Sequence, residues 1–257
     1  MAQRKNNVPP RAQTNWAYFL DVDGTLIAFA DSPDAIQVDD VLLDLIRRLY
    51  RICNGALALV SGRALADLDK RLGGMRIPIA GQHGLELRDA QGHLQTYTGT
   101  PSATLNELKH RVSALVASHQ GLLLEDKGLA LAVHYRQVPH LASYIHRQIN
   151  LWLVESGSPL QLQKGRYVLE LKPAIRDKGT AIAEFMRQIP FYGRLPVFIG
   201  DDVTDEHGFE MVNQLGGHSI KVGKGRTCAR WRLRDVAAVR AWLAEDFGEG
   251  DIVHEQS

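Results

Sequence analysis

Four polar segments of the sequence carry the side chains that could do chemistry. Asp21 and Asp23 stand two residues apart and are followed by Gly24-Thr25, and a second acidic pair, Asp201-Asp202, comes much later in the chain. Carboxylates gathered at one site repel each other and raise each other's pKa unless a cation is present. This set therefore favours a site for a hard cation with oxygen ligands, such as Mg²⁺.

Two further segments, Ser61-Gly62-Arg63 and Lys178, add groups that bind phosphate oxygens. Lys178 supplies a fixed positive charge, while the Ser61 hydroxyl and the backbone N–H groups around Thr25 and Gly62 supply donors. An anionic nucleophile, a divalent cation, a lysine and hydroxyl donors are together the parts of a phosphoryl-transfer site. Each segment alone also has a plainer interpretation, as a helix cap or a turn, but their combination is far more specific.

Strands and helices of a parallel sheet are expected to position these segments. Short apolar runs at 16–20, 56–60 and 197–199 predict buried strands, and each run is followed directly by one of the polar segments. Lys178 opens a helix expected over 178–189. Residues 16–80 alternate strand and helix, which is typical of a parallel sheet covered by helices. Ligands bind such sheets at the carboxyl ends of the strands, so the four segments are expected to meet there.

The middle of the chain has a different pattern. Hairpins and helices predict an α+β unit of mostly antiparallel strands inserted into the parallel-sheet domain. Along the expected strand 129–136, Ala130, Ala132, His134 and Arg136 share one face. Such a face suits a sheet surface above a cleft, although it is also what the solvated side of any antiparallel sheet presents.

Composition excludes several classes of protein. The 257 residues carry a formal net charge of +1, which gives no electrostatic reason to expect nucleic-acid or membrane binding. No apolar run approaches the ~20 residues of a membrane span. Two cysteines outside a CxxC pair indicate reduced thiols in a cytoplasmic protein. The segments 1–14 and 248–257 are predicted as flexible tails, the first without the apolar stretch of a signal peptide. The arginines between 226 and 234 are predicted as a solvated loop.

The polar segments resemble the motifs of a known superfamily. The segments 21–26 (DVDGTL), 61–63 (SGR), Lys178 and 200–206 (GDDVTDE) resemble the four motifs of the haloacid-dehalogenase-like phosphatases. Four others, 81–84 (GQHG), 125–127 (EDK), 134–136 (HYR) and 169–173 (LELKP), resemble the trehalose-phosphatases within that superfamily. One departure lies in 173–178 (PAIRDK), where such enzymes more often have a glycine before the lysine.

The resemblance implies an α/β fold and an activity. The fold would be a Rossmann-like, haloacid-dehalogenase-like parallel-sheet core over 15–98 and 174–247, with an inserted α+β cap over 99–173 that acts as a lid. The activity would be Mg²⁺-dependent hydrolysis of trehalose 6-phosphate in trehalose biosynthesis. A phosphatase for sucrose 6-phosphate or a glycosyl-phosphoglycerate stays open, as do a phosphotransferase or mutase and a silent sugar-phosphate-binding domain.

The resemblance also implies residue roles. Asp21 would be the nucleophile and Asp23 the general acid and base, while Lys178 and Ser61 would bind the phosphoryl group. Mg²⁺ would be held by the Asp21 side chain, the Asp23 backbone carbonyl and Asp201, with Asp202 and Asp205 around them. The substrate-binding residues would be Thr25, Gly62, Arg63, His83, Lys127, His134, Arg136 and Glu170. The only expected partner is a small sugar phosphate, bound by a monomer or a weak homo-oligomer.

Overall fold

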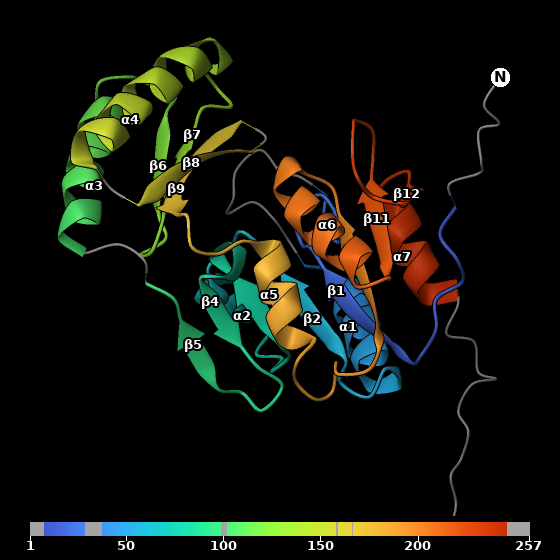
Figure 1. Cartoon of the computed structure of the whole chain (residues 1–257). Helices are drawn as coiled ribbons and strands as arrows, with labels where there is room; N and C mark the ends of the chain where they lie inside the picture. Colours follow the sequence, from blue (N-terminus) through green and yellow to red (C-terminus); the bar gives the residue numbers. More distant parts are fainter. Residues whose placement is uncertain (1–7, 29–37, 99–101, 158, 166, 246–257) are drawn as a thin grey trace, which may run out of the picture.

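The chain forms two β-sheets of different size and type (Figure 1). The computed structural model describes residues 8–28, 38–98, 102–157, 159–165 and 167–245. The larger sheet has eight strands in the order β12-β11-β10-β1-β2-β3-β4-β5, and the smaller has four in the order β6-β7-β9-β8. The strands of the larger sheet are β1 (Trp16–Leu20), β2 (Leu57–Val60), β3 (Ile79–Gly81), β4 (Glu86–Arg88), β5 (Leu94–Thr96), β10 (Leu195–Gly200), β11 (His218–Val222) and β12 (Trp231–Leu233).

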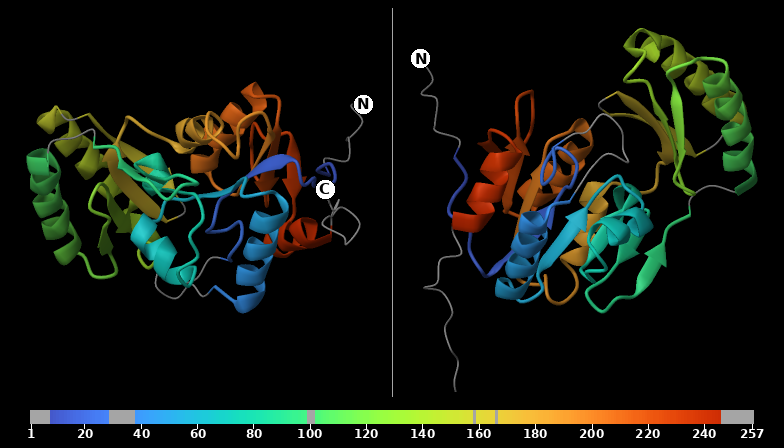
Figure 2. Two further views of the ribbon diagram at one scale, coloured as in Figure 1. Left: turned by 90° about the horizontal axis from the view of Figure 1, so that it is seen from below. Right: turned by 180° about the vertical axis from the view of Figure 1, so that it is seen from behind.

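Parallel strands make up the centre of the larger sheet, as the sequence predicts. β1 pairs in parallel with both β10 and β2, and every residue of these three strands except Leu195 is buried. Strands buried on both faces read as continuous apolar runs, which is why they could be found from the sequence. The helices α5 (Lys178–Phe185) and α6 (Glu206–Gln214) lie side by side on one face, and α1 (Asp40–Ile52) and α7 (Val236–Glu245) on the other (Figures 1 and 2).

Short strands extend this sheet at both of its edges. The predicted hairpin forms β4 and β5, which extend the sheet antiparallel to β3. At the opposite edge β12 pairs in parallel with β11, Lys221 facing Arg232. The prediction of a solvated loop is therefore wrong at Arg232, because a three-residue edge strand has too little sequence pattern to distinguish it from a loop.

The smaller sheet is antiparallel and has helices on one face only. Its elements are α3 (Ser102–Ala117), β6 (Leu123–Asp126), β7 (Leu131–His134), α4 (Ala142–Ser156), β8 (Leu160–Gly165) and β9 (Val168–Pro173). Leu131, Val133, Leu169 and Leu171 form a separate apolar core with residues of α3 and α4. Alternation along the strands therefore turns Ala132 and Glu170, which are direct neighbours across β7 and β9, to the opposite face.

The chain enters the smaller unit after β5 and returns from β9 to α5, so the unit is an insertion between strands of the larger sheet. The division into core and cap at residues 98 and 174 stays a prediction. Within the predicted N-terminal tail, residues 8–14 contact the core: Trp242 donates to the carbonyl of Pro10, and Ala12 is buried. No helix among the described residues is both long and apolar enough to span a membrane.

Candidate active site

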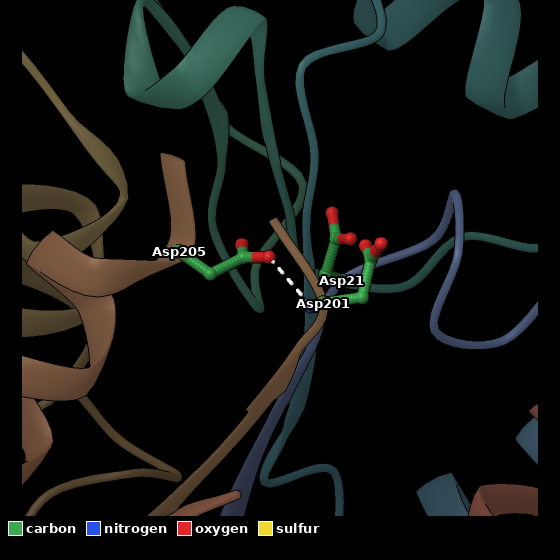
Figure 3. Close-up of side chains that lie close together, drawn as sticks. All are labelled: Asp21, Asp201 and Asp205. Atoms are coloured by element: carbon green, nitrogen blue, oxygen red, sulfur yellow. Dashed lines mark hydrogen bonds between the residues drawn. The ribbon is translucent and has the colours of Figure 1, made fainter. Parts of the chain in front are cut away.

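The acidic side chains gather at the carboxyl ends of β1 and β10. These neighbouring strands are in register, with Leu20 opposite Ile199, so the residues that follow them emerge at the same level. Carboxylate oxygens of Asp21, Asp201 and Asp205 all lie within 4.8 Å of one another. Figure 3 shows the side chains of Asp21 and Asp201 next to each other, with Asp205 reaching towards them from the short helix η4 (Val203–Asp205).

Lys178 joins this cluster from the start of α5. Asp177 caps that helix through a reciprocal capping box with Thr180, which fixes where the lysine begins the first turn. The Nζ atom of Lys178 donates to Asp21 Oδ1 at 2.7 Å and to Asp205 Oδ1 at 2.6 Å. Although burial acts in the opposite direction, the carboxylates of Asp205 and Asp21 raise the pKa of Lys178, so it stays charged.

Asp205 shapes the loop after β10. It is fully buried, and its Oδ2 accepts the backbone N–H groups of Asp201 and Asp202 at 2.8 and 2.9 Å. Because its Oδ1 binds Lys178, both of its oxygens already have partners. Asp202 instead accepts the N–H of Val203 and caps η4. These contacts orient the segment that presents Asp201.

The donor set at this site fits a divalent cation. Oδ1 of Asp201 is buried and has no hydrogen-bond partner among the described residues. A Cβ at Gly24 would collide with the Asp201 carboxylate, so the glycine leaves room for the close approach of these loops. Burial and the neighbouring carboxylates raise the pKa of Asp21 well above its ordinary value and that of Asp201 to about 7. A bound cation would offset this repulsion, and oxygen-only donors suit Mg²⁺ or a similar hard ion.

Asp23 lies outside this carboxylate cluster because Arg63 binds its side chain. The guanidinium donates to both oxygens of Asp23, Nε at 2.7 Å and Nη2 at 2.8 Å, and its Nη1 donates to Asp67 at 2.8 Å. Such a paired contact fixes both position and orientation. Arg63 was predicted to reach the sugar, whereas here it orients Asp23. A sugar contact from Arg63 stays a prediction.

The predicted phosphate-binding groups lie on the loops at the carboxyl ends of β1 and β2. The hydroxyl of Thr25 lies 3.4 Å from Asp21 Oδ2 and is fully buried. Ser61 is buried at the end of β2, and its Oγ accepts the N–H of Arg63 at 3.2 Å. A Cβ at Gly62 would come within 2.7 Å of the His83 ring, so this position needs glycine. Thr25 is therefore held by the loop that follows β1, and Ser61 and Gly62 by the loop that follows β2, next to His83 after β3.

The face of the smaller sheet that lacks helices contacts the larger unit through polar side chains. His83 Nε2 lies 2.9 Å from Glu170 Oε2 and 3.3 Å from the Gln163 amide. Lys127 donates to the Gly62 carbonyl at 2.8 Å and lies 3.4 Å from Glu170 Oε1. Although burial acts in the opposite direction, Lys127 and His83 hold the pKa of Glu170 below its usual range. The four side chains thus form a polar cluster, buried at His83 and Glu170 and half-buried at Lys127 and Gln163, next to the loop that carries Ser61.

His134 and Arg136 lie further from this cluster. His134 Nε2 is 2.8 Å from Glu125 Oε2, on the same strand face as Glu170. The Arg136 guanidinium lies 5.5 Å from the centroid of the Tyr167 ring. Within the described residues, neither side chain has a hydrogen bond to the larger unit, but the Glu125 partner of His134 interacts electrostatically with Lys127 and Glu170.

One polar residue of this face, Gln163, was not predicted from the sequence, whereas Lys172 belongs to the segment 169–173 already singled out. Gln163 faces Glu170 directly across β8 and β9, and Lys172 is fully buried two residues beyond Glu170. Burial lowers the pKa of Lys172 to about 8. The signal for Gln163 was the alternation along β8, which places it on the face of Glu170 once the pairing of β8 with β9 is known.

His83 makes stability sensitive to pH. Burial lowers its pKa from 6.5 to about 4, although Glu170 acts in the opposite direction; Lys172 and Lys178 reinforce the lowering. As pH falls from 6.5 to 4 the unfolded chain takes up a proton that the folded chain refuses, so stability is lost in that window, by about 3 kcal/mol. We expect His83→Gln to remove this part of the pH dependence. Urea unfolding of both proteins at pH 6.5 and pH 4.5 measures it, and parallel losses would contradict the assignment.

Comparison with known proteins gives the family. The trehalose-phosphatase family model matches residues 19–237. The trehalose-6-phosphate phosphatase of Escherichia coli K12 is 42% identical over 238 residues, which cover 91% of this chain and 87% of the relative. The C-terminal domain of C. albicans trehalose-6-phosphate phosphatase superposes with a TM-score of 0.79 at 20% identity, covering 93% of this chain and 98% of that one.

A haloacid dehalogenase-like hydrolase from B. subtilis superposes with a TM-score of 0.61 at 14% identity over 88% of this chain and 98% of that one. At such identities the two solved structures show the fold alone. They confirm the predicted parallel-sheet core of the haloacid-dehalogenase type with an additional antiparallel sheet. The chain belongs to the trehalose-phosphatase family.

Proposed function

We propose that this protein hydrolyses trehalose 6-phosphate to trehalose and phosphate, using Mg²⁺. One observation carries the proposal: Asp21 and Asp201 meet Lys178 at the carboxyl ends of the parallel strands, beside the polar face of the inserted sheet. Family membership and the name of the E. coli relative support the choice of substrate.

Asp21 is proposed as the nucleophile. One of its carboxylate oxygens attacks phosphorus while the bond from phosphorus to the sugar oxygen breaks, which leaves an aspartyl-phosphate and the sugar alcohol. Water then attacks the same phosphorus atom and releases inorganic phosphate, which restores the carboxylate. Lys178, 2.7 Å from Asp21 Oδ1, and the hydroxyls of Thr25 and Ser61 are the groups that would balance the charge of the phosphoryl oxygens.

Asp23 is proposed as the general acid and base. It protonates the leaving sugar oxygen in the first step and removes a proton from the attacking water in the second. Its side chain now faces Arg63, so it must turn towards the phosphoryl group for either transfer. The bond to Arg63 Nε can persist while the other carboxylate oxygen turns. Arg63 thus keeps Asp23 next to the site through these bonds.

The residues that would hold Mg²⁺ are the side chains of Asp21 and Asp201 and the backbone carbonyl of Asp23. When bound, the ion neutralises negative charge on the phosphoryl oxygens and on the two carboxylates. Asp205 and Asp202 orient the Asp201 segment through their bonds to the backbone.

The disaccharide is proposed to lie under the inserted sheet. Glu170 and Lys127 on this face and His83 on the neighbouring loop would bind the sugar hydroxyls, because charged groups hydrogen-bond strongly to hydroxyls and the imidazole adds a further polar contact. His134 and Arg136 would reach the outer part of a long substrate from the same face.

Phosphate release from a panel of substrates tests the proposal. The panel contains trehalose 6-phosphate, sucrose 6-phosphate, a glycosyl-phosphoglycerate and a small aryl phosphate, each with Mg²⁺ and with a chelator. We expect trehalose 6-phosphate to give the highest kcat/KM, and chelation to abolish release until Mg²⁺ is restored. Preference for another sugar phosphate would overturn the substrate assignment. Appearance of a new sugar phosphate would indicate a transferase, and binding without release would indicate a silent domain.

A further inference from the structure

The two chain segments that enter and leave the smaller unit are joined by a stacked pair. Tyr97 directly follows β5 on the way out of the larger sheet, and Arg176 lies between β9 and α5 on the way back. The guanidinium carbon of Arg176 lies 3.9 Å from the centroid of the Tyr97 ring. Arginine stacks on aromatic rings with a favourable cation–π energy, so the pair holds the two segments together.

Glu184 closes the cluster from α5. It accepts Arg176 Nη2 at 2.6 Å, and its second oxygen lies 2.6 Å from the Tyr97 hydroxyl. The side chains of Arg176 and Glu184 are only 13% and 19% exposed, so this ion pair is screened much less than one on the surface. Tyr97, Arg176 and Glu184, here called the clasp, therefore fix both segments to the same helix that begins with Lys178.

Arg176 also makes hydrogen bonds next to both His83 and Glu170, two of the residues proposed to bind the sugar. Its Nε donates at 3.0 Å to the carbonyl of Gly84, the residue after His83. Its own carbonyl accepts Lys172 Nζ at 3.1 Å, from the strand that carries Glu170. His83 and Glu170 meet at 2.9 Å, so Arg176 is bonded to the immediate surroundings of each partner while contacting neither.

We propose that Arg176 is a positioning residue that sets the inserted sheet and His83 at the separation needed to bind a disaccharide phosphate. The inference rests on the proposed function. A planar guanidinium is needed because one side chain must stack on Tyr97, pair with Glu184 and donate to Gly84 at once, which a lysine ammonium does not do. The residue thereby determines selectivity for the sugar rather than the chemistry at Asp21.

Steady-state kinetics on two substrates tests this inference. We expect Arg176→Gln to lower kcat/KM for trehalose 6-phosphate about tenfold, mainly through KM, and that for p-nitrophenyl phosphate by less than about twofold. Arg176→Lys keeps the charge next to Glu184 and is expected to recover part of the loss. Arg194→Gln is the matched control, since Arg194 also donates to backbone carbonyls, those of Thr14 and Trp16 at the opposite end of β1. Arg194→Gln should leave the ratio of the kcat/KM values for the two substrates unchanged.

An equal loss on both substrates, or no loss on the disaccharide phosphate, would overturn the inference. If Arg176→Gln does not fold, Tyr97→Leu removes the stack while the ion pair remains. It should shift the substrate ratio in the same direction, and an unchanged ratio would count against the clasp. A wild-type enzyme that prefers another sugar phosphate would contradict the proposed function instead. The kcat/KM ratio of the Arg176 variants would then be measured with that sugar phosphate and p-nitrophenyl phosphate.

Discussion

Replacement of Asp21 by asparagine is expected to lower phosphate release from every substrate on the order of 10⁴-fold or more. The amide keeps the shape of the side chain and can still accept a hydrogen bond from Lys178, but it has no anionic oxygen to attack phosphorus. Because no covalent intermediate can form, the loss should be in kcat and should be the same for trehalose 6-phosphate and an aryl phosphate. Initial rates at saturating substrate and Mg²⁺ measure it.

The stability of Asp21→Asn separates loss of the nucleophile from unfolding. Burial, with added repulsion from Asp205 and Asp201, raises the pKa of Asp21. Ionised Asp21 therefore lowers the stability of the folded protein when no metal is bound. The thermal unfolding midpoint of the metal-free variant should therefore equal or exceed that of the wild type. Asp89→Asn is the control, since Asp89 is a buried turn residue that accepts two backbone N–H groups, which an amide oxygen can also accept. Substantial activity of Asp21→Asn beside a normal control would remove Asp21 as the nucleophile.

The elements that present the proposed catalytic groups could be predicted because their sequence signals are local. The apolar runs of β1, β2 and β10 are continuous, and a polar segment follows each run immediately. Parallel strands in a sheet end at a common edge, so residues 180 apart in the chain, Asp21 and Asp201, could be placed together before any coordinates were known.

The partners that depend on tertiary pairing could not be predicted. Nothing local to Arg63 shows that its guanidinium faces Asp23 rather than a ligand. Gln163 joins Glu170 only through the register of β8 with β9, and Arg176 meets Tyr97 only because the insertion enters and leaves at adjacent points. The register of paired strands and the points where the insertion enters and leaves depend on packing across the whole folded protein. A single sequence carries little information about either.

Among residues of the inserted sheet, Glu170 is the one whose replacement is expected to lower kcat/KM for trehalose 6-phosphate most. In Glu170→Gln the side chain keeps its size, but Lys127 and His83 lose the carboxylate that both now face. Losing a hydrogen bond between a sugar hydroxyl and a buried carboxylate costs up to about 3 kcal/mol of binding free energy, which corresponds to roughly a hundredfold in kcat/KM. We expect this loss with trehalose 6-phosphate and a much smaller one with p-nitrophenyl phosphate, which has no sugar to bind. Arg136→Gln should show the same selectivity to a lesser degree, because Arg136 is near Tyr167 and not in the Glu170 cluster.

The matched control for Glu170 is Glu155→Gln on the outer surface of the same unit. Glu155 also pairs with a cation, Arg111, but its side chain is 60% exposed and lies away from the sheet face, so both substrates should be hydrolysed at wild-type rates. If Glu170→Gln lost the same factor on both substrates, Glu170 would act on the catalytic loops through His83 and not on the sugar. The selectivity for a disaccharide would then have to come from the loops of the parallel sheet, and the insertion would serve only to shield the site from bulk water while one water molecule hydrolyses the aspartyl-phosphate.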